Sequence, residues 1–315
     1  MKAIEPEKEK DYLRIFETVR REPLIRCSSI SKILGMSRNT VQKYVKEMHS
    51  ETILVGPYLH LKSSVNYPRY IQMATFSSPG RTFESFKGFP NITYHALCSG
   101  DWNFLFVTER IFDFSKLVGH SQTHFCGKRR SVWDIPPQSC TWDDAFNCLQ
   151  ESLDKNIPRS TIPSGGEVEI PWSEDEWKLY DVLKDNLRLR ITPTIKKVNV
   201  RYETYIGWKK TLPRYTETIT AYYPEGFLTQ IQVFFLVEAK KIAHIPSLFG
   251  YWPSTTVFYR AGDKLLVLLA LRNRELMSKT LSLFDDLLSR GYISSYKYAL
   301  LLQQWRHETI DLAVL

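Results

Sequence analysis

The stretch Ser31-Lys-Ile-Leu-Gly-Met-Ser-Arg-Asn-Thr-Val-Gln-Lys-Tyr-Val-Lys-Glu-Met48 decides how the N-terminal part of this chain folds. Gly35 tolerates the left-handed backbone of a tight turn, and Ser37 is a favoured residue to cap the start of a helix. Apolar residues recur at helical spacing on both sides of that turn. They form one seam: Ile30, Leu34, Met36, Val41 and Val45. The pattern predicts a helix-turn-helix.

The polar residues of the second helix stay outside this seam. Arginine, asparagine and glutamine are the side chains best able to read base edges, whereas lysine, serine and threonine suit phosphates. We therefore predict double-stranded DNA as a partner. The predicted contacts are Ser37, Arg38, Asn39, Thr40, Gln42, Lys43 and Lys46. The alternative is an interaction protein whose helical hairpin only packs or dimerises.

A second stretch, 195–212, resembles the first at an offset of 164 residues, so that Leu34 matches Val198 and Tyr44 matches Trp208. Further on, Gly100-Asp101 matches Gly262-Asp263 at an offset of 162 residues. Each Gly-Asp pair lies between two strand-like runs, as a hairpin turn does. Two matches in the same order indicate a tandem duplication.

The second helix-turn-helix is degenerate. Gly207 falls inside its second helix, which costs about 1 kcal/mol relative to alanine, and Tyr202, Glu203 and Ile206 replace the readers of the first copy. Lysine and arginine still dominate 184–214, so we expect phosphate contacts without base reading. The predicted contacts are Lys196, Lys197, Arg201, Lys209 and Lys210.

Strand and helix patterns after each helical segment follow the order β-α-β-β-α-β, which is typical of a ferredoxin-like sheet. The expected elements include strands over 70–76 and near 131–135 and a helix over 112–118 in the first copy, and a strand over 264–271 in the second. A Pro-, Ser- and Gly-rich stretch separates the copies, and Ser173 with Glu176 forms a capping box. We predict an α+β fold with two winged helix-turn-helix domains and two ferredoxin-like βαββαβ domains in tandem. The predicted parts are a winged helix-turn-helix (1–64), a βαββαβ effector-type domain (65–154), a linker (155–172), a second, degenerate winged helix-turn-helix (173–222) and a second βαββαβ domain (223–315).

Composition limits the surroundings of the protein. The 315 residues are 43% hydrophobic and 24% charged, with a net charge of +8 that favours a polyanionic partner. No apolar run has the length of a membrane span, and the first residues lack the apolar segment of a secretory signal. Five cysteines without a CxxC pair indicate reduced thiols. We predict a cytoplasmic protein with no membrane partner.

The chain resembles the Lrp/AsnC (feast/famine) family of prokaryotic regulators. Leu34-Gly-Met-Ser-Arg-Asn-Thr-Val41 looks like the family's recognition motif, and Ser99-Gly-Asp-Trp-Asn-Phe-Leu105 looks like its effector-domain turn. The resemblance implies a sequence-specific transcription regulator that forms a homodimer or, with two copies in one chain, an intramolecular pseudo-dimer. It also implies a small-molecule effector, such as an amino acid, near the two turns. That effector site would comprise Gly100, Asp101, Gly262 and Asp263.

Siroheme decarboxylases use the same architecture, and a fused pair of their Lrp-like subunits is an alternative. Their catalysis relies on a His- and Arg-containing segment near the first strand of the effector domain. Here those regions read Val65-Asn-Tyr-Pro-Arg-Tyr70 and Ala221-Tyr-Tyr-Pro-Glu-Gly-Phe227, with Arg69 but no histidine. P-loop, GxSxG and HExxH motifs are absent as well. We therefore predict no catalytic residues, no cofactor and no enzyme activity.

Four residues whose side chains can bind a metal lie close together in the sequence, and whether they bind zinc stays open. The spacing of His120 and His124 would place both imidazoles on one face of a helix. Isolated histidines and cysteines are more often structural, so we predict no metal site. The four residues are His120, His124, Cys126 and Cys140.

Overall fold

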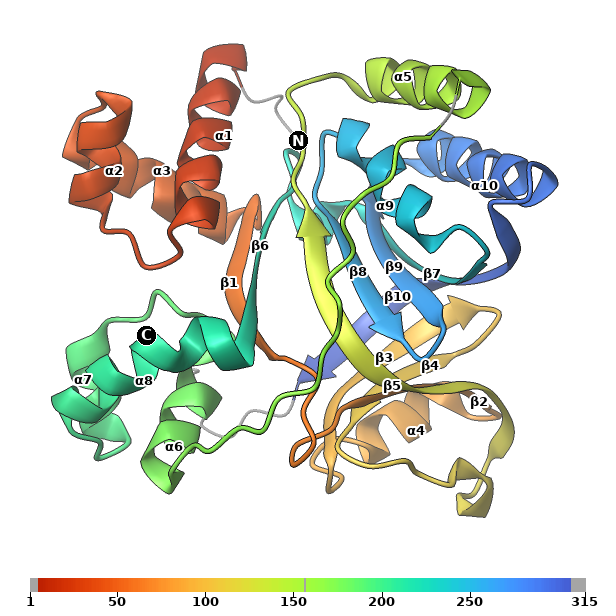
Figure 1. Ribbon diagram of the computed structural model, residues 1–315, viewed down its shortest axis with the longest axis horizontal. Coiled ribbons are helices and arrows are strands. Elements are labelled where there is room, and N and C mark those ends of the chain that lie inside the picture. Colours follow the sequence, from red (N-terminus) through yellow and green to blue (C-terminus); the bar gives the residue numbers. More distant parts are fainter. Residues whose placement is uncertain (1–4, 156, 307–315) are drawn as a thin grey trace.

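The computed structural model describes residues 5–155 and 157–306 (Figure 1). The ends of the first and last predicted domains, 1–4 and 307–315, and position 156 of the predicted linker lie outside these ranges. The first half contains helices α1 (Pro6–Arg21), α2 (Cys27–Leu34), α3 (Arg38–Ser50), α4 (Pro79–Ser85) and α5 (Trp142–Lys155), strands β1 (Leu54–Leu61), β2 (Tyr70–Phe76), β3 (Ile92–Gly100), β4 (Phe104–Thr108) and β5 (His120–Ile135), and the 3-10 helix η1 (Phe114–Lys116).

The second half repeats the order of three helices, a strand and a β-helix-β-β-helix-β segment. It contains helices α6 (Glu174–Leu183), α7 (Ile191–Lys197), α8 (Tyr202–Tyr215), α9 (Ile245–Leu248) and α10 (Arg274–Ser289), strands β6 (Thr216–Tyr222), β7 (Ile231–Ala239), β8 (Thr256–Ala261), β9 (Lys264–Leu271) and β10 (Ile293–Arg306), and the 3-10 helices η2 (Phe227–Thr229), η3 (Ile242–His244) and η4 (Phe249–Tyr251). Among the described residues, no helix is long and apolar enough to cross a bilayer.

Helices α1–α3 form the first helical unit around the expected apolar seam. Ile30 and Val41 are fully buried, and Leu34, Met36 and Val45 pack against the same core. Gly35 adopts the left-handed conformation with φ of 67°, and the Ser37 hydroxyl accepts the Thr40 N–H at 3.1 Å. The turn and the cap therefore form as the sequence indicates.

Helices α6–α8 form the second helical unit. Its first helix carries the expected capping box between Ser173 and Glu176. Asn199 occupies the left-handed turn before α8 with φ of 54°. Arg201 precedes α8 without a side-chain cap. The two units thus share a layout, but the second has the weaker helix start.

Strands β1 and β6 join the two helical units. They pair antiparallel from Leu54 opposite Tyr222 to Leu61 opposite Thr216, and they form a two-stranded ribbon. In Figure 1 this ribbon lies between the helical units on the left and the larger sheet on the right. The ribbon therefore links segments that lie far apart in the sequence.

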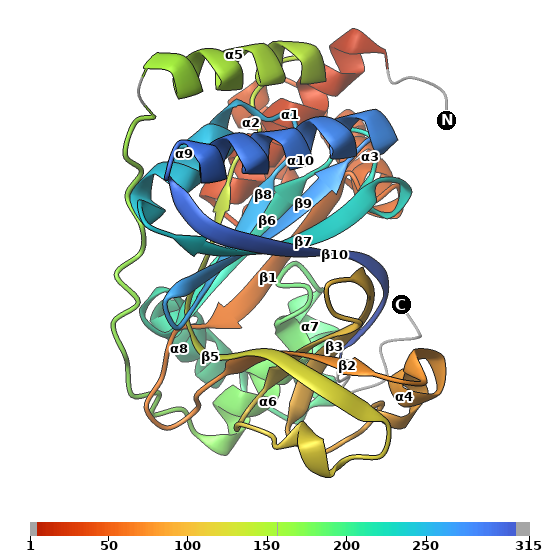
Figure 2. The ribbon, with the colours of Figure 1, turned by 90° about the vertical axis from the view of Figure 1, so that its right-hand side faces the viewer.

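The other eight strands close into one sheet with the order β10-β3-β4-β2-β5-β8-β9-β7. The two half-sheets meet within the chain, where β5 pairs with β8 and β10 pairs with β3. Helices α5, α9 and α10 cover one side, and α4 covers the opposite end (Figures 1 and 2). Side chains such as Phe235 and Phe284, whose rings stack at 4.1 Å, fill the core beneath α10. Burying one such side chain stabilises the fold by about 1.5–3 kcal/mol.

Two expectations about the first half are wrong in detail. The helix expected over 112–118 is only the short η1, because Asp113 caps a single turn and Gly119, with φ of 82°, redirects the chain. The strand expected near 131–135 begins at His120, since β5 pairs first with β2 and then with β8. Tertiary pairing thus outweighs the polar local sequence. Helix α5 was not expected, although Trp142, Ala145, Leu149 and Leu153 have helical spacing and are buried.

Candidate functional site

A cavity of about 840 Å³ lies between the β1–β6 ribbon, α6 and the closed sheet. Its volume is typical of sites for large small-molecule ligands, which span about 300–1,000 Å³. The side formed by the closed sheet is apolar, and we call it the floor. The floor residues are Ile71, Leu105, Val107, Phe234, Leu266 and Leu268.

Arg129 is the central charged group of this cavity. It lies on β5, its residue is only 7% exposed, and one guanidinium nitrogen donates to the Leu61 carbonyl at 2.8 Å. No described carboxylate forms an ion pair with it, because the nearby Glu217 accepts the Val132 N–H at 2.7 Å instead. Burial lowers the pKa of Arg129, but a guanidinium remains charged at neutral pH. A buried cation of this kind is suited to bind an anion.

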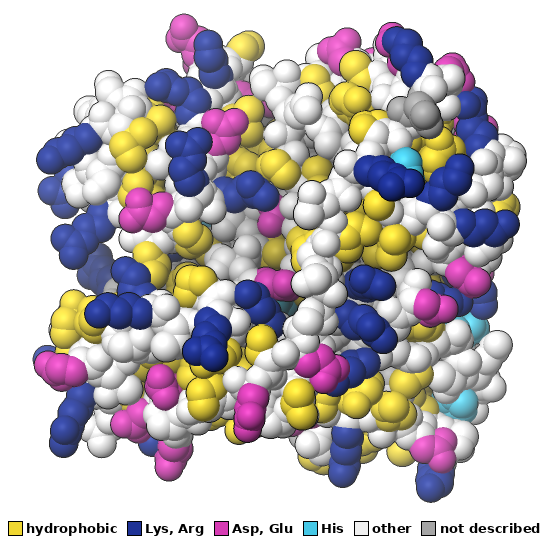
Figure 3. Space-filling model, viewed as in Figure 1, with side chains coloured by type: hydrophobic (Ala, Val, Ile, Leu, Met, Phe, Trp, Pro, Cys, Tyr) yellow, Lys and Arg dark blue, Asp and Glu magenta, His cyan; other side chains and the backbone are white. Residues whose placement is uncertain are grey.

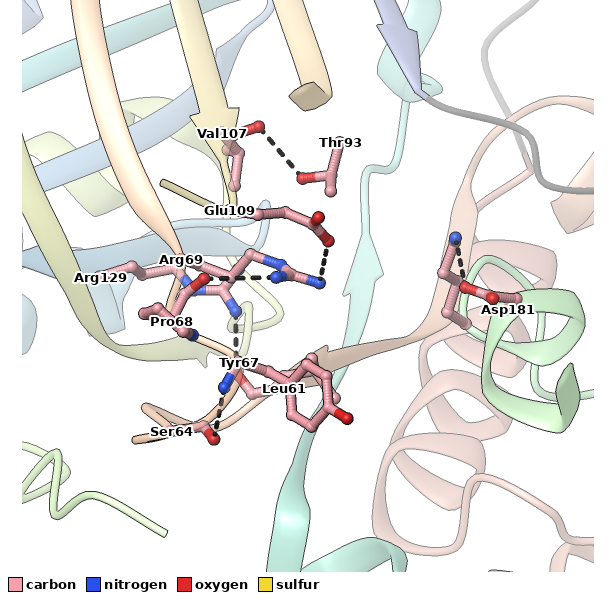
Figure 4. Close-up of polar contacts among 11 residues, drawn as sticks. Leu61, Ser64, Tyr67, Pro68, Arg69, Thr93, Val107, Glu109, Arg129 and Asp181 are labelled. Carbon is pink, nitrogen blue, oxygen red and sulfur yellow. Dashed lines mark hydrogen bonds and ion pairs between the residues drawn. The ribbon is translucent and has the colours of Figure 1, made fainter. Parts of the chain in front are cut away.

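Arg69 lies beside Arg129, and Figure 4 shows the two side chains next to each other. The backbone holds them together, since the Arg129 main-chain N–H donates to the Arg69 main-chain carbonyl at 2.8 Å. Unlike its neighbour, Arg69 forms an ion pair with Glu109 at 3.0 Å. The pair of guanidiniums makes this end of the cavity cationic.

Two further cations lie on the side of α6 and β10. Lys184 pairs with Asp181 at 3.1 Å, and Arg306 pairs with Asp185 at 2.9 Å. The Arg306 guanidinium also lies over the ring of Tyr58, 4.7 Å from its centre. Each of these charges is therefore balanced by a carboxylate.

His60 projects from β1 into the same cavity. Its ring and the Tyr259 ring pack edge to face with their centres 6.1 Å apart. The imidazole forms no hydrogen bond with another described residue. Burial, together with the charges of Arg129 and Arg306, holds the pKa of His60 well below the usual 6.5. The imidazole is therefore neutral at neutral pH and can accept a proton.

Tyrosines complete the polar lining. The Tyr94 hydroxyl donates to Gln304 at 3.1 Å. Burial raises the pKa of Tyr180 to about 12, so its hydroxyl stays protonated and available as a hydrogen-bond donor. The lining tyrosines are Tyr58, Tyr67, Tyr94, Tyr180, Tyr223 and Tyr259.

A second cavity of about 580 Å³ lies between the end of α1, α8 and β5. Two of its charged groups have partners within the protein: Asp134 pairs with Arg20 at 2.6 Å, and Lys62 donates to the Pro213 carbonyl at 2.7 Å. We therefore take the larger cavity as the candidate site.

The residues expected to contact DNA lie away from both cavities, except Lys209, which lines the smaller one. In the first copy they are exposed on α3 and its cap, with Thr40 partly covered. In the second copy Lys196, Lys197, Arg201 and Lys210 are exposed as well. Figure 3 shows Lys and Arg side chains gathered along the edge that the helical units form.

The two Gly-Asp turns lie where the half-sheets join. Asp101 accepts the Tyr298 N–H at 2.8 Å, and a Cβ atom at Gly100 would collide with the Tyr298 carbonyl. The Gly262 N–H donates to the Lys128 carbonyl at 2.9 Å. Neither these residues nor Asp263 line the two cavities. In this structure the turns serve strand pairing, and their effector role stays a prediction.

The candidate metal ligands do not come together in the described residues. His120 and His124 lie on β5, so the helix that would align them is absent there. His124 bonds to the Thr75 hydroxyl at 2.8 Å, and the Cys140 thiol bonds to the Tyr251 carbonyl at 3.1 Å. Within the described ranges, no group of three or more His, Cys, Asp or Glu side chains is placed to hold a metal ion.

Comparison with known proteins rests on structure, since no family model and no curated protein sequence matches the chain. The siroheme decarboxylase NirDL has a TM-score of 0.50 and 12% identity, covering 96% of this chain and 94% of that chain. The same enzyme with an iron-uroporphyrin III analogue has a TM-score of 0.46 at the same identity and coverage. LrpC of B. subtilis has a TM-score of 0.31 and 18% identity, covering 41% of this chain and 94% of that chain.

The likeness to NirDL shows that the chain shares the α+β fold of that protein over nearly its whole length. It also corrects one expectation. The absence of catalytic motifs led us to expect that the chain is not an enzyme, and this is contradicted because the full-length likeness is to an enzyme. The sequence has no histidine beside Arg69, and His60 on the preceding strand was missed. The alternation of Tyr58 and His60 with Leu59 and Leu61 is the signal that could have indicated it.

Proposed function

We propose that the chain binds a carboxylate-bearing tetrapyrrole in the central cavity and decarboxylates it. The observation that carries this proposal is Arg129, a buried cation without a carboxylate partner, in the same cavity as the unbonded ring of His60. The fold likeness to a siroheme decarboxylase supports the proposal. Function follows from the site more than from the fold, so the arginine and the histidine are the residues to test.

The two residues have different tasks in this proposal. Arg129 anchors a carboxylate that does not react, since an ion pair would stabilise that anion against loss of carbon dioxide. The reacting carboxylate lies nearer His60, between β1 and the apolar floor. As its bond to carbon breaks, carbon dioxide leaves with the carboxylate carbon, and the electron pair remaining on the ring substituent takes up one proton. His60 takes that proton from solvent water and passes it to the carbon, and protonated tyrosines such as Tyr180 orient the substrate.

Anaerobic incubation with siroheme and with iron coproporphyrin III tests the proposal. We expect mass spectrometry to show loss of carbon dioxide from one of them, and a change in the Soret band to report binding. Arg129→Gln should weaken binding, and His60→Gln should slow turnover while the Soret change persists. Arg130→Gln is the matched control, because Arg130 is the exposed neighbour of Arg129 on β5. Unchanged turnover in the His60 variant would remove that residue from the mechanism.

We propose DNA binding through α3 as a second function. The observation that favours it is the row of exposed polar side chains on α3, which includes Arg38, Asn39 and Gln42, above a buried apolar seam. Such a helix presents groups that match base edges in the major groove. Binding to genomic fragments, selected and then sequenced, tests this function independently of the cavity.

A further inference from the structure

The charges around the cavity limit the charge of its ligand. Four cationic side chains line it, and three of them already have a carboxylate partner: Arg69 with Glu109, Lys184 with Asp181, and Arg306 with Asp185. Among the described lining residues, only Arg129 lacks one. The cavity therefore offers one uncompensated positive charge, and it lies at the end next to Arg69.

The rest of the lining is suited to an apolar ring system. The floor consists of aliphatic and aromatic side chains from β2, β4, β7 and β9. Opposite the floor, β1 and α6 supply phenols and the neutral His60 in place of further free cations. Any carboxylate of the ligand beyond the anchored one and the reacting one near His60 would lie beside Glu109, Asp181 or Asp185, or would have to displace one of them. Placing like charges side by side in such a site is strongly unfavourable.

We infer that the cavity selects a tetrapyrrole with few carboxylates, anchored by one carboxylate on Arg129, over the fully carboxylated uroporphyrin class. The inference rests on the proposed function, because it names the substrate class of the same site. Glu109 has the leading part in this selection. Its ion pair with Arg69 neutralises the guanidinium that would otherwise complete a double-arginine site beside Arg129.

Titration of the full chain with iron porphyrins of increasing carboxylate number tests the inference. The probes are iron protoporphyrin IX, iron coproporphyrin III and iron uroporphyrin III, and the Soret change gives Kd at constant ionic strength. We expect affinity to fall along this series, by at least about tenfold from the first to the last. Glu109→Gln should reduce this difference in Kd, because it removes the carboxylate that pairs with Arg69. Glu84→Gln should leave it unchanged, since Glu84 is exposed on α4 and pairs with Lys87.

Each outcome decides one point. Tighter binding of iron uroporphyrin III than of iron protoporphyrin IX would overturn the inference and leave the proposed function standing. Equal binding of all three would overturn it as well, because no selection by charge would exist. No Soret change with any of the three would contradict the proposed function itself, and the inference with it. If Glu109→Gln fails to fold, Glu109→Ala together with the wild-type series keeps the test decisive.

Discussion

The two halves of the chain follow the same order of elements, yet they contribute different side chains to the cavity. His60 on β1 corresponds to Tyr222 on β6, and Arg69 before β2 corresponds to Ile231 on β7. Arg129 pairs with Ala261 beside one Gly-Asp turn, as Leu300 pairs with Ser99 beside the other.

At these three positions the second half thus has an apolar or phenolic side chain where the first half has a histidine or an arginine. The space next to Tyr222, the counterpart of His60, is also filled, because Tyr222 packs against Phe16 with ring centres 5.4 Å apart. The first half supplies Arg129 and His60, whereas the cations that the second half contributes, Lys184 and Arg306, are held in ion pairs. The charge of the cavity therefore follows from individual side chains rather than from the repeated backbone.

Removing the anchor should have the largest effect. Arg129→Gln retains a donor for the Leu61 carbonyl but loses the charge, so we expect porphyrin binding to weaken by about 3 kcal/mol, roughly a hundredfold in Kd. Soret titration measures this, with Arg130→Gln as the exposed control on the same strand. An equal loss of porphyrin affinity in both variants would mean that general surface charge attracts the ligand. That result would contradict the role of Arg129 as the anchor that the second half lacks.

The two helical units should differ next. Arg38→Ala on α3 should cost about 1–3 kcal/mol at a selected DNA site if this residue reads a base. The corresponding Tyr202→Ala on α8 should change sequence preference little. Fluorescence anisotropy with selected and random duplexes separates the two cases. A larger loss from Tyr202→Ala would show that the second unit, and not the first, reads sequence.

His60 should make stability depend on pH, whereas Tyr222 cannot in this range. Because the folded pKa of His60 lies well below the usual 6.5, the unfolded chain binds more protons as the pH falls. Stability from the neutral imidazole is thus present above about pH 6.5 and is lost as pH falls towards the folded pKa. Between pH 7 and 5.5 we expect the wild type to lose about 1 kcal/mol more than His60→Gln. Urea unfolding at both pH values gives the difference, and His95 contributes equally to both proteins.

The starts of α3 and α8 should show the smallest difference, and it concerns the stability of the chain. Ser37 caps α3 through the Thr40 N–H, so Ser37→Ala should destabilise the chain by about 1 kcal/mol. Arg201 gives α8 no side-chain cap, so Arg201→Ser should stabilise it by about 0.5 kcal/mol. Thermal unfolding monitored by circular dichroism reports both changes. Destabilisation by Arg201→Ser would indicate that the arginine has a contact more important than the missing cap.

Much of the local structure could be predicted from the sequence, because its causes are local. The left-handed turn at Gly35, the capping box of Ser173 with Glu176 and the strands over 70–76 and 264–271 all form as expected. The α+β class is confirmed, and the likeness to NirDL shows a shared fold over nearly the whole chain. The winged helix-turn-helix assignment and the domain limits stay predictions, and the expectation of a non-enzyme was wrong.

The sequence by itself determined the turns, the helix caps and most of the helices and strands, since spacing and capping act within a few residues. Only the tertiary structure decided where the site lies. Arg129 stands in the run Lys128-Arg129-Arg130, which is typical of a surface, and it is buried because β5 passes from β2 to β8 at that point. His60 faces a cavity because β1 pairs with the distant β6. Long-range pairing fixes both surroundings, and no local pattern carries that information.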